Sequence, residues 1–150
     1  MNLRFAPVDF ESGESWVDKI VAAGFDGSRA AVVASLGVTQ YITPDATLET
    51  MQSVARFAAG TTLVCSFMLP AGLAEPVEFE TRAATEAGAS RRGHPWISSF
   101  TPDEFLAIAK RAGFDSVRHV SVEDLTQLYF AGRADGLRPS SSEHLIVATT

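Results

Sequence analysis

Apolar residues in this chain form short runs of strand length, separated by longer segments with helical periodicity. The runs at residues 30–36 and 61–69 are apolar on both faces, which is typical of strands inside a parallel sheet that helices cover. Shorter strands are predicted at residues 3–8, 117–120 and 144–149. The order of strands and helices predicts an α/β fold with a doubly wound sheet.

Two helix starts are marked by the same tripeptide, Thr-Pro-Asp. Thr43 and Thr101 are each suited to cap a helix, with a proline at the first helical position and an acid in the first turn. Glu104, three residues after Thr101, adds a capping box. Three further helices are predicted, at residues 14–23, 75–87 and 121–130.

The segment from residue 71 to residue 100 has the least regular pattern. Apart from the helix predicted within it, residues 88–93 contain two glycines and two arginines and are expected to be mobile. Long segments between core elements often form lids or binding loops. We therefore predict a single domain over residues 1–150 with a mobile loop or lid around 71–100.

The turn after the strand at residues 30–36 is the expected ligand site. In open α/β sheets, ligands bind beside the loop that leaves the carboxyl end of a central strand. Here that loop runs from Gly37 to Tyr41, and Gly37 would let a ligand approach the backbone closely. Leu36 and Val38 would flank the ligand. The alternative is an ordinary tight turn between a strand and a helix.

Composition excludes several classes of protein. Hydrophobic residues make up 46% of the chain and charged residues 20%, and the net charge of −6 gives no basic footprint for nucleic acid. The longest apolar region, residues 63–73, is too short to span a bilayer and contains Pro70. Cys65 has no second cysteine to pair with, which fits a reducing compartment. A cytoplasmic location without membrane contact is expected.

The histidines and the cysteine offer little catalytic chemistry. His94, His119 and His144 lie far apart with no metal-ligand spacing, so no metal site is expected. His94, in the irregular segment, is the one acid–base candidate. Cys65 lies in an expected buried strand and is interpreted as an inert core thiol.

Three arginines are candidates for binding a carboxylate, which a guanidinium can hold through two hydrogen bonds. Arg133 is the best of them, and Arg91 and Arg92 lie in the irregular segment. The favoured alternative is that all three are solvated loop residues. Trp16 and Trp96 are interpreted as packing residues, although Trp96 is placed where it could close over a substrate.

Three segments carry a resemblance to a known family. Residues 36–43, Leu-Gly-Val-Thr-Gln-Tyr-Ile-Thr, resemble the "GVTxYLT" signature of the S-adenosylmethionine-dependent methyltransferases related to leucine carboxyl methyltransferase. Residues 5–10 resemble the third strand of that family and the acid after it. Residues 129–139, followed by Glu143, His144 and Leu145, resemble its C-terminal block. The spacing agrees, so the resemblance covers nearly the whole chain.

The resemblance implies part of a Rossmann-like class I methyltransferase sheet, whose strand order is 3-2-1-4-5-7-6. The chain would supply the equivalents of strands 3 to 7 without strands 1 and 2, with helices on both faces. The glycine-rich cofactor loop and the ribose-binding acid of the family are not found in this sequence. The chain thus resembles the C-terminal half of the fold, and we expect it to be truncated and to bind cofactor weakly or not at all.

The resemblance also implies a function, that of an S-adenosylmethionine-dependent O-methyltransferase. Asp9 would accept a hydrogen bond from the adenine amino group and Phe10 would pack beside the ring, while Leu36 and Gly37 would flank the cofactor. Tyr41 and Arg133 are the expected substrate contacts. No catalytic residue is assigned, because methyl transfer to a charged carboxylate needs alignment and exclusion of water more than a base.

An exposed sheet edge would follow from the missing strands. The strand from Ala30 to Leu36 would lose a neighbour, and an open apolar edge invites pairing with another chain. Either residues 3–8 cover this edge or a second subunit does, so a homodimer is expected. Two alternatives to an active single chain remain open: a non-catalytic dimeric assembly module, and an enzyme whose N-terminal half another polypeptide supplies.

Overall fold

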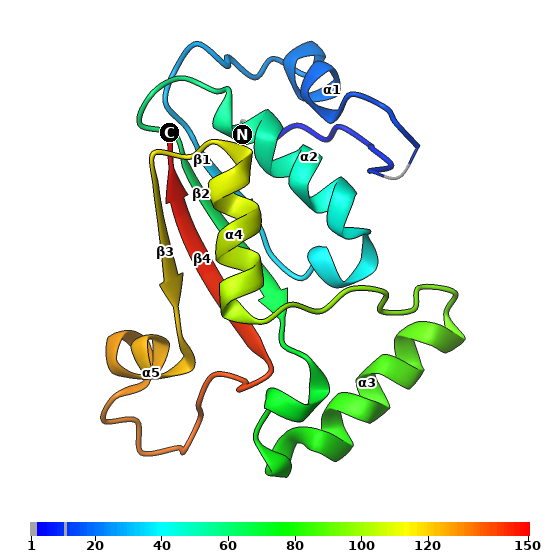
Figure 1. Cartoon of the computed structure of the whole chain (residues 1–150), viewed down its shortest axis with the longest axis vertical. Coiled ribbons are helices and arrows are strands. Elements are labelled where there is room, and N and C mark those ends of the chain that lie inside the picture. Colours follow the sequence, from blue (N-terminus) through cyan, green and yellow to red (C-terminus); the bar gives the residue numbers. More distant parts are fainter. Residues whose placement is uncertain (1–2, 11) are drawn as a thin grey trace.

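The structure, a computed structural model, describes residues 3–10 and 12–150. Its centre is a four-stranded sheet in the order β1-β2-β4-β3 (Figure 1). The strands are β1 (Val32–Ser35), β2 (Thr62–Met68), β3 (Ser116–Val120) and β4 (Glu143–Thr149). β1 and β2 are parallel, whereas β4 lies antiparallel between β2 and β3. This is the order that the resemblance implies for strands 4, 5, 7 and 6.

Five α-helices lie among the described residues, and the two with marked starts are capped as the sequence predicts. The Thr43 hydroxyl accepts a hydrogen bond from the Ala46 amide, and Thr101 and Glu104 form the capping box. The helices are α1 (Trp16–Ala22), α2 (Pro44–Ala55), α3 (Phe79–Arg91), α4 (Pro102–Ala112) and α5 (Val122–Leu125). Short 3-10 turns occupy Thr39–Tyr41, Ala71–Leu73 and Pro76–Glu78, and a π-helical turn occupies Thr126–Phe130.

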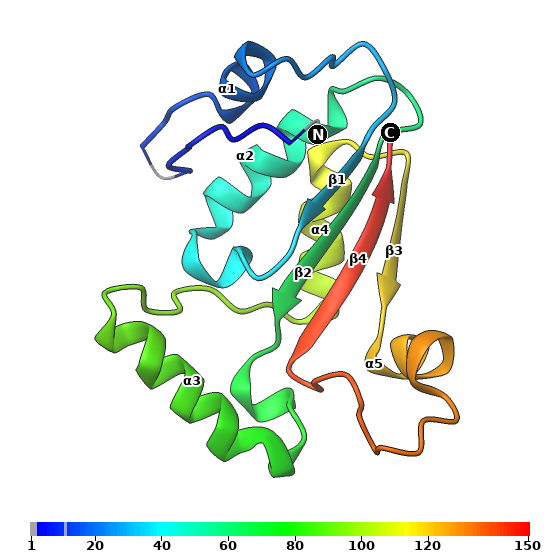
Figure 2. The same cartoon turned by 180° about the vertical axis from the view of Figure 1, so that it is seen from behind.

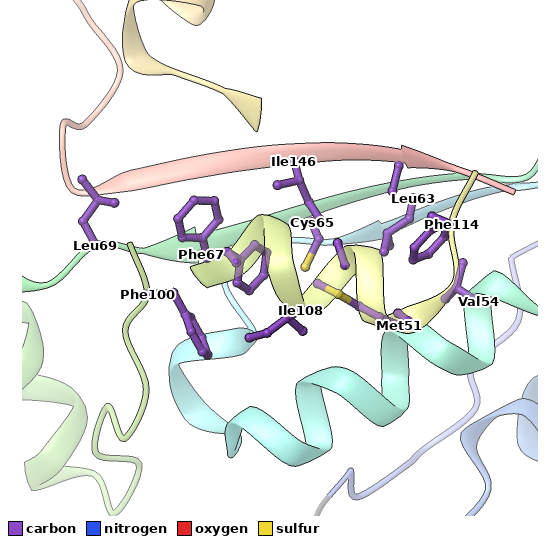
Figure 3. Packing of buried hydrophobic residues seen from close by; sticks show 14 residues of the cluster. Met51, Val54, Leu63, Cys65, Phe67, Leu69, Phe100, Ile108, Phe114 and Ile146 are labelled. Carbon is purple, nitrogen blue, oxygen red and sulfur yellow. The ribbon is translucent and has the colours of Figure 1, made fainter. Parts of the chain in front are cut away.

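The hydrophobic core lies between the sheet and helices α2 and α4 (Figure 3). The Phe67 and Phe105 rings stack there with their centroids 4.2 Å apart, and both side chains are completely buried. Met51 of α2 and Ile146 of β4 fill the space beside them. A core of fully buried, interdigitated side chains holds the two helices firmly on this face of the sheet.

The other face of the sheet carries no such layer, and the expectation of helices on both faces is wrong for the described residues (Figure 2). The cause is the direction of the connections. Both the β1–α2–β2 and the β2–α4–β3 crossovers step the same way across the sheet, and right-handed crossovers that do so place their helices on one face. Val64 and Val147, paired across β2 and β4, are only partly buried.

The strand expected at residues 3–8 does not form. Residues 3–9 lie outside the sheet, and the Arg4 guanidinium donates a hydrogen bond to the Ala23 carbonyl at the end of α1. Pro7 has no amide to donate to a sheet ladder, which is consistent with this departure. Among the described residues β1 pairs with β2 alone, so residues 3–8 do not cover its edge. The Val32 side chain, on the uncovered face, is 77% exposed.

The segment from 71 to 100 contains α3, which lies a turn later than the helix predicted at residues 75–87. Residues 88–91, expected to be mobile, form the last turn of this helix, where Gly88 and Ala89 are buried. Movement of the segment as a lid stays a prediction. Within the described part of the chain, no helix has the length and apolar character needed to cross a membrane.

Candidate functional site

A cavity of about 450 Å³ opens at the carboxyl ends of the parallel strands β1 and β2. This volume falls in the range of small-molecule sites. Four parts of the chain line it. The first is the turn after β1 together with the end of β2, and the second is helix α3 with Glu78, the residue before it. The third is Trp96, and the fourth is the stretch that leads into β4. The cavity therefore lies where the sequence places the ligand site.

The turn after β1 is held by one residue of β2. The Gly37 amide donates to the Ser66 hydroxyl oxygen at 2.8 Å, and the Thr39 hydroxyl donates to the Ser66 carbonyl at 3.0 Å. Gly37 has a φ of 67°, and a Cβ built there would meet only the Gln40 amide nitrogen, at 4.0 Å. The Gly37 backbone is therefore open to close approach by a ligand.

The segment after α3 runs back along this turn. The Ile97 amide donates to the Gln40 carbonyl at 2.8 Å, and the Ser98 hydroxyl donates to the Ile42 carbonyl at 2.7 Å. These bonds bring the Trp96 ring to the cavity beside Gln40, whose side chain is also part of the lining. The position that the sequence suggests for Trp96, over a bound substrate, is compatible with this geometry.

Glu78 connects the start of α3 to the stretch before β4. Its carboxylate accepts hydrogen bonds from the Ser140 hydroxyl at 2.7 Å and the Ser141 amide at 2.9 Å. Burial raises the pKa of Glu78, but the combined hydrogen bonds from Ser140, Ser141 and Ser142 outweigh it and hold the pKa below its usual range. Glu78 is thus an ionised anchor of the cavity wall.

Arg82 is the functional candidate that the sequence prediction missed. Its side chain is 7% exposed, its Nε donates to Glu86 Oε1 at 2.8 Å, and its guanidinium carbon lies 5.5 Å from the centroid of the Trp96 ring. Arg82 and the buried Ala89 are seven residues apart and so share one side of α3. Because α3 has no apolar stripe, its sequence carries no signal that would have shown Arg82 on the inward side.

The structure brings only one of the six predicted site residues to the cavity, namely Gly37. Leu36 is 57% exposed beside it, and Tyr41 lines a separate pocket with Arg92 and His94. The binding roles of these residues stay predictions.

The remaining predicted contacts lie elsewhere. Phe10 packs against Trp16 at 6.4 Å between ring centroids and lines a pocket between α1 and α2, and Asp9 immediately precedes it. Arg133 forms an ion pair with Asp135, its Nε donating to Oδ1 at 3.0 Å. Arg138, five residues later, lines the cavity in its place and pairs with Glu75.

Two histidines that are distant in sequence are neighbours in the sheet. His119 Nε2 and His144 Nδ1 lie 2.8 Å apart, and both rings contact Phe67. Burial, followed by the nearby His119, lowers the pKa of His144. Among the residues described, no group of three or more potential ligands could hold a metal ion. Burial raises the pKa of the Cys65 thiol to about 12, as an inert core thiol requires.

Comparison with known proteins identifies the relatives of this chain. Residues 1–55 match the sequence profile of the leucine carboxyl methyltransferase family. A Bacillus subtilis (strain 168) protein named "Putative S-adenosyl-L-methionine-dependent methyltransferase YktD" is 25% identical over 153 residues. Over residues 1–55 the chain is thus similar to the leucine carboxyl methyltransferase family. The match to the Bacillus subtilis protein covers 98% of this chain but only 48% of the relative, so the chain spans about half of that protein's length.

Solved structures share the fold of this chain. A DUF574 family protein from Streptomyces avermitilis MA-4680 matches with a TM-score of 0.59 and 16% identity, over 87% of this chain and 50% of that protein. A SAM-dependent methyltransferase from Archaeoglobus fulgidus matches with a TM-score of 0.51 and 11% identity, over 91% of this chain and 66% of that one. The four-stranded mixed sheet therefore matches methyltransferase folds over part of their length.

Proposed function

We propose that this chain forms the C-terminal half of an S-adenosylmethionine-dependent O-methyltransferase site. The observation that carries the proposal is the cavity at the carboxyl ends of β1 and β2, which opens beside the turn that resembles the family signature. The relation to the leucine carboxyl methyltransferase family and the sheet order support the same reading.

The turn after β1 fits one side of the cofactor. The open backbone at Gly37 admits close approach, and the exposed Leu36 side chain offers an apolar surface next to it. Asp9 and Phe10 are proposed, by resemblance, to contact the adenine, although they lie outside this cavity. The described residues thus supply part of a cofactor site, and weak binding by the chain alone is expected.

In the proposed reaction, the bound cofactor supplies an electrophilic methyl group on a sulfonium. The residues of this chain orient the acceptor and keep water away from it, which is the main protein contribution to such a displacement. Trp96 and Met68 give the cavity apolar walls, while Arg82 and Gln40 give it polar groups that fix orientation.

Titration of the ¹⁵N-labelled chain with S-adenosylhomocysteine tests the proposal. The amide signals of Gly37 and Gln40 are expected to shift progressively with ligand concentration, with weak affinity. A Gly37→Ala variant should weaken the response further, because the added methyl group narrows the approach to the backbone. Gly132→Ala is the matched control, since Gly132 has a similar φ of 75° outside the cavity. Absence of any shift at the cavity would reject the cofactor role.

A dimeric assembly module is the second candidate, favoured by the open edge of β1. Within the part of the chain that the structure describes, this strand pairs with β2 alone, and its residue Val32 is 77% exposed. A lysine on such an edge prevents strand pairing. Sedimentation velocity over a dilution series should show a dimer that Val32→Lys dissociates. The control Val77→Lys changes a residue that is 72% exposed away from the sheet. A wild-type chain that stays monomeric at all concentrations would refute the dimer.

A further inference from the structure

Three polar atoms of the cavity residues lack hydrogen-bond partners. Over the described part of the chain, five buried side-chain nitrogen or oxygen atoms have none, and three of these belong to residues that line this cavity. They are Gln40 Oε1, Arg82 Nη1 and Trp96 Nε1. Native proteins leave few buried polar atoms unsatisfied, and each one calls for a physical reason.

The three residues are also held next to one another. The Arg82 guanidinium lies over the Trp96 ring at 5.5 Å, and the residue after Trp96 is hydrogen-bonded to the Gln40 carbonyl at 2.8 Å. Counted over the whole residue, Arg82 is 8% exposed and Gln40 is 6% exposed. Both side chains are therefore held by their surroundings. The residues of one cavity wall thus carry two N–H donors and one oxygen acceptor without hydrogen-bond partners.

Two other charged groups of the cavity, Glu78 and Arg138, are already engaged. Glu78 is held by Ser140, Ser141 and Ser142, and Arg138 pairs with Glu75 at 2.8 Å. Arg82 uses its Nε for Glu86, which leaves Nη1 as a donor without a partner. A guanidinium that retains such a donor within a cavity is well suited to hold an oxygen anion.

We propose that Arg82, Trp96 and Gln40 form a subsite for a small organic acid. Its carboxylate accepts hydrogen bonds from Arg82 Nη1 and Trp96 Nε1, and a hydroxyl group of the same molecule donates to Gln40 Oε1. The carboxylate is the anchor of the bound acid. Binding of the acid does not rest on the proposed methyltransferase function, whereas a role for the acid as methyl acceptor would.

Binding is tested on the ¹⁵N-labelled chain without any cofactor. Benzoate and 3-hydroxybenzoate are titrated alongside their neutral amides, benzamide and 3-hydroxybenzamide. The indole N–H signal of Trp96, assigned with Trp96→Phe, reports occupancy next to Arg82. We expect each acid to shift this signal saturably and to bind at least tenfold more tightly than its amide. Equal affinity for acid and amide, or no shift at all, would overturn the proposal.

Variants on α3 provide the matched comparison. Arg82→Gln should weaken acid binding at least tenfold and leave amide binding unchanged, while Arg91→Gln, an exposed charge on the same helix, should change neither. Equal losses in the two variants would refute a specific role for Arg82. If Arg82→Gln does not fold, the acid–amide comparison on the unchanged chain decides alone. Acid binding without S-adenosylhomocysteine binding would retain the subsite and reject the methyltransferase role. S-adenosylhomocysteine binding without acid binding would retain the methyltransferase role and reject the subsite.

Discussion

Replacing Ser66 with alanine should loosen the turn that borders the cavity. Ser66 is 1% exposed, and its hydroxyl oxygen accepts the Gly37 amide at 2.8 Å. Ser66→Ala removes this acceptor and leaves the Gly37 N–H without a partner in a partly buried place. The loss of a single such partner costs about 1–3 kcal/mol, and we expect about 1.5 kcal/mol because the turn is not fully buried.

Urea denaturation followed by circular dichroism measures this change in the free energy of unfolding. The midpoint should fall while the slope stays constant, since the surface exposed on unfolding is nearly the same. Ser53→Ala is the control: the Ser53 hydroxyl donates to the Glu49 carbonyl on an exposed helix face, and its loss should change stability by less than about 0.5 kcal/mol.

Amide hydrogen exchange gives a local measure of the same change. In the wild-type chain the Gly37 amide should be protected by its bond to Ser66, and Ser66→Ala should speed its exchange more than that of amides in α4. A destabilisation of Ser66→Ala no larger than that of Ser53→Ala, with unchanged exchange at Gly37, would refute the role assigned to Ser66.

Three further predictions concern the core, a helix cap and pH. Phe105→Ala should destabilise the chain by about 3–5 kcal/mol in urea denaturation, because the fully buried ring stacks on Phe67, and a loss below about 1 kcal/mol would contradict this packing. Thr101→Ala should cost about 1 kcal/mol in the same assay by removing the capping box, and no loss would contradict it. The pKa of His144 in the folded chain is lowered below 6.5, so the unfolded chain binds more protons at this residue. The free energy of unfolding should therefore fall as the pH drops below about 6.5. His144→Gln should flatten this decline in thermal unfolding measured from pH 7.5 to pH 5, and an unchanged decline would exclude His144 as its source.

The elements that the sequence predicts best are those with local physical causes. The apolar runs predict β1 and β2, of which β2 is mostly buried and β1 is partly buried or exposed. Helices α2 and α4 begin where Thr-Pro-Asp caps them. Gly113, which closes α4, has a φ of 101°, a conformation that favours glycine. The position of a turn relative to a strand likewise predicts Gly37 at the ligand site, and Gly37 lines the cavity.

The features that the sequence did not predict depend on partners distant in the chain. His119 and His144 meet because β3 and β4 pair, and neither residue's neighbours in sequence indicate that register. Arg82 was hidden because α3 has no apolar stripe to show which side faces inward. The sequence favours Arg133 over Arg91 and Arg92, yet Asp135, two residues away, occupies the Arg133 guanidinium. Arg138, which lines the cavity, is not among the candidates from sequence.

The open side of the cavity and the open edge of β1 have one structural cause. Both crossovers among the described residues step in the same direction, whereas a ligand crevice in an open α/β sheet forms where that direction reverses. A strand that paired parallel to β1 would end beside Gly37 and would supply the reversal. When the partner strand is parallel to β1, edge pairing and cofactor affinity should change together in Val32→Lys, whereas an antiparallel partner strand, as in a twofold-symmetric dimer through β1, should leave cofactor affinity unchanged. Ser66→Ala should reduce cofactor affinity and leave the oligomeric state unchanged, because it loosens the turn and not the edge. This difference separates an edge that completes the site from an edge that only assembles the protein.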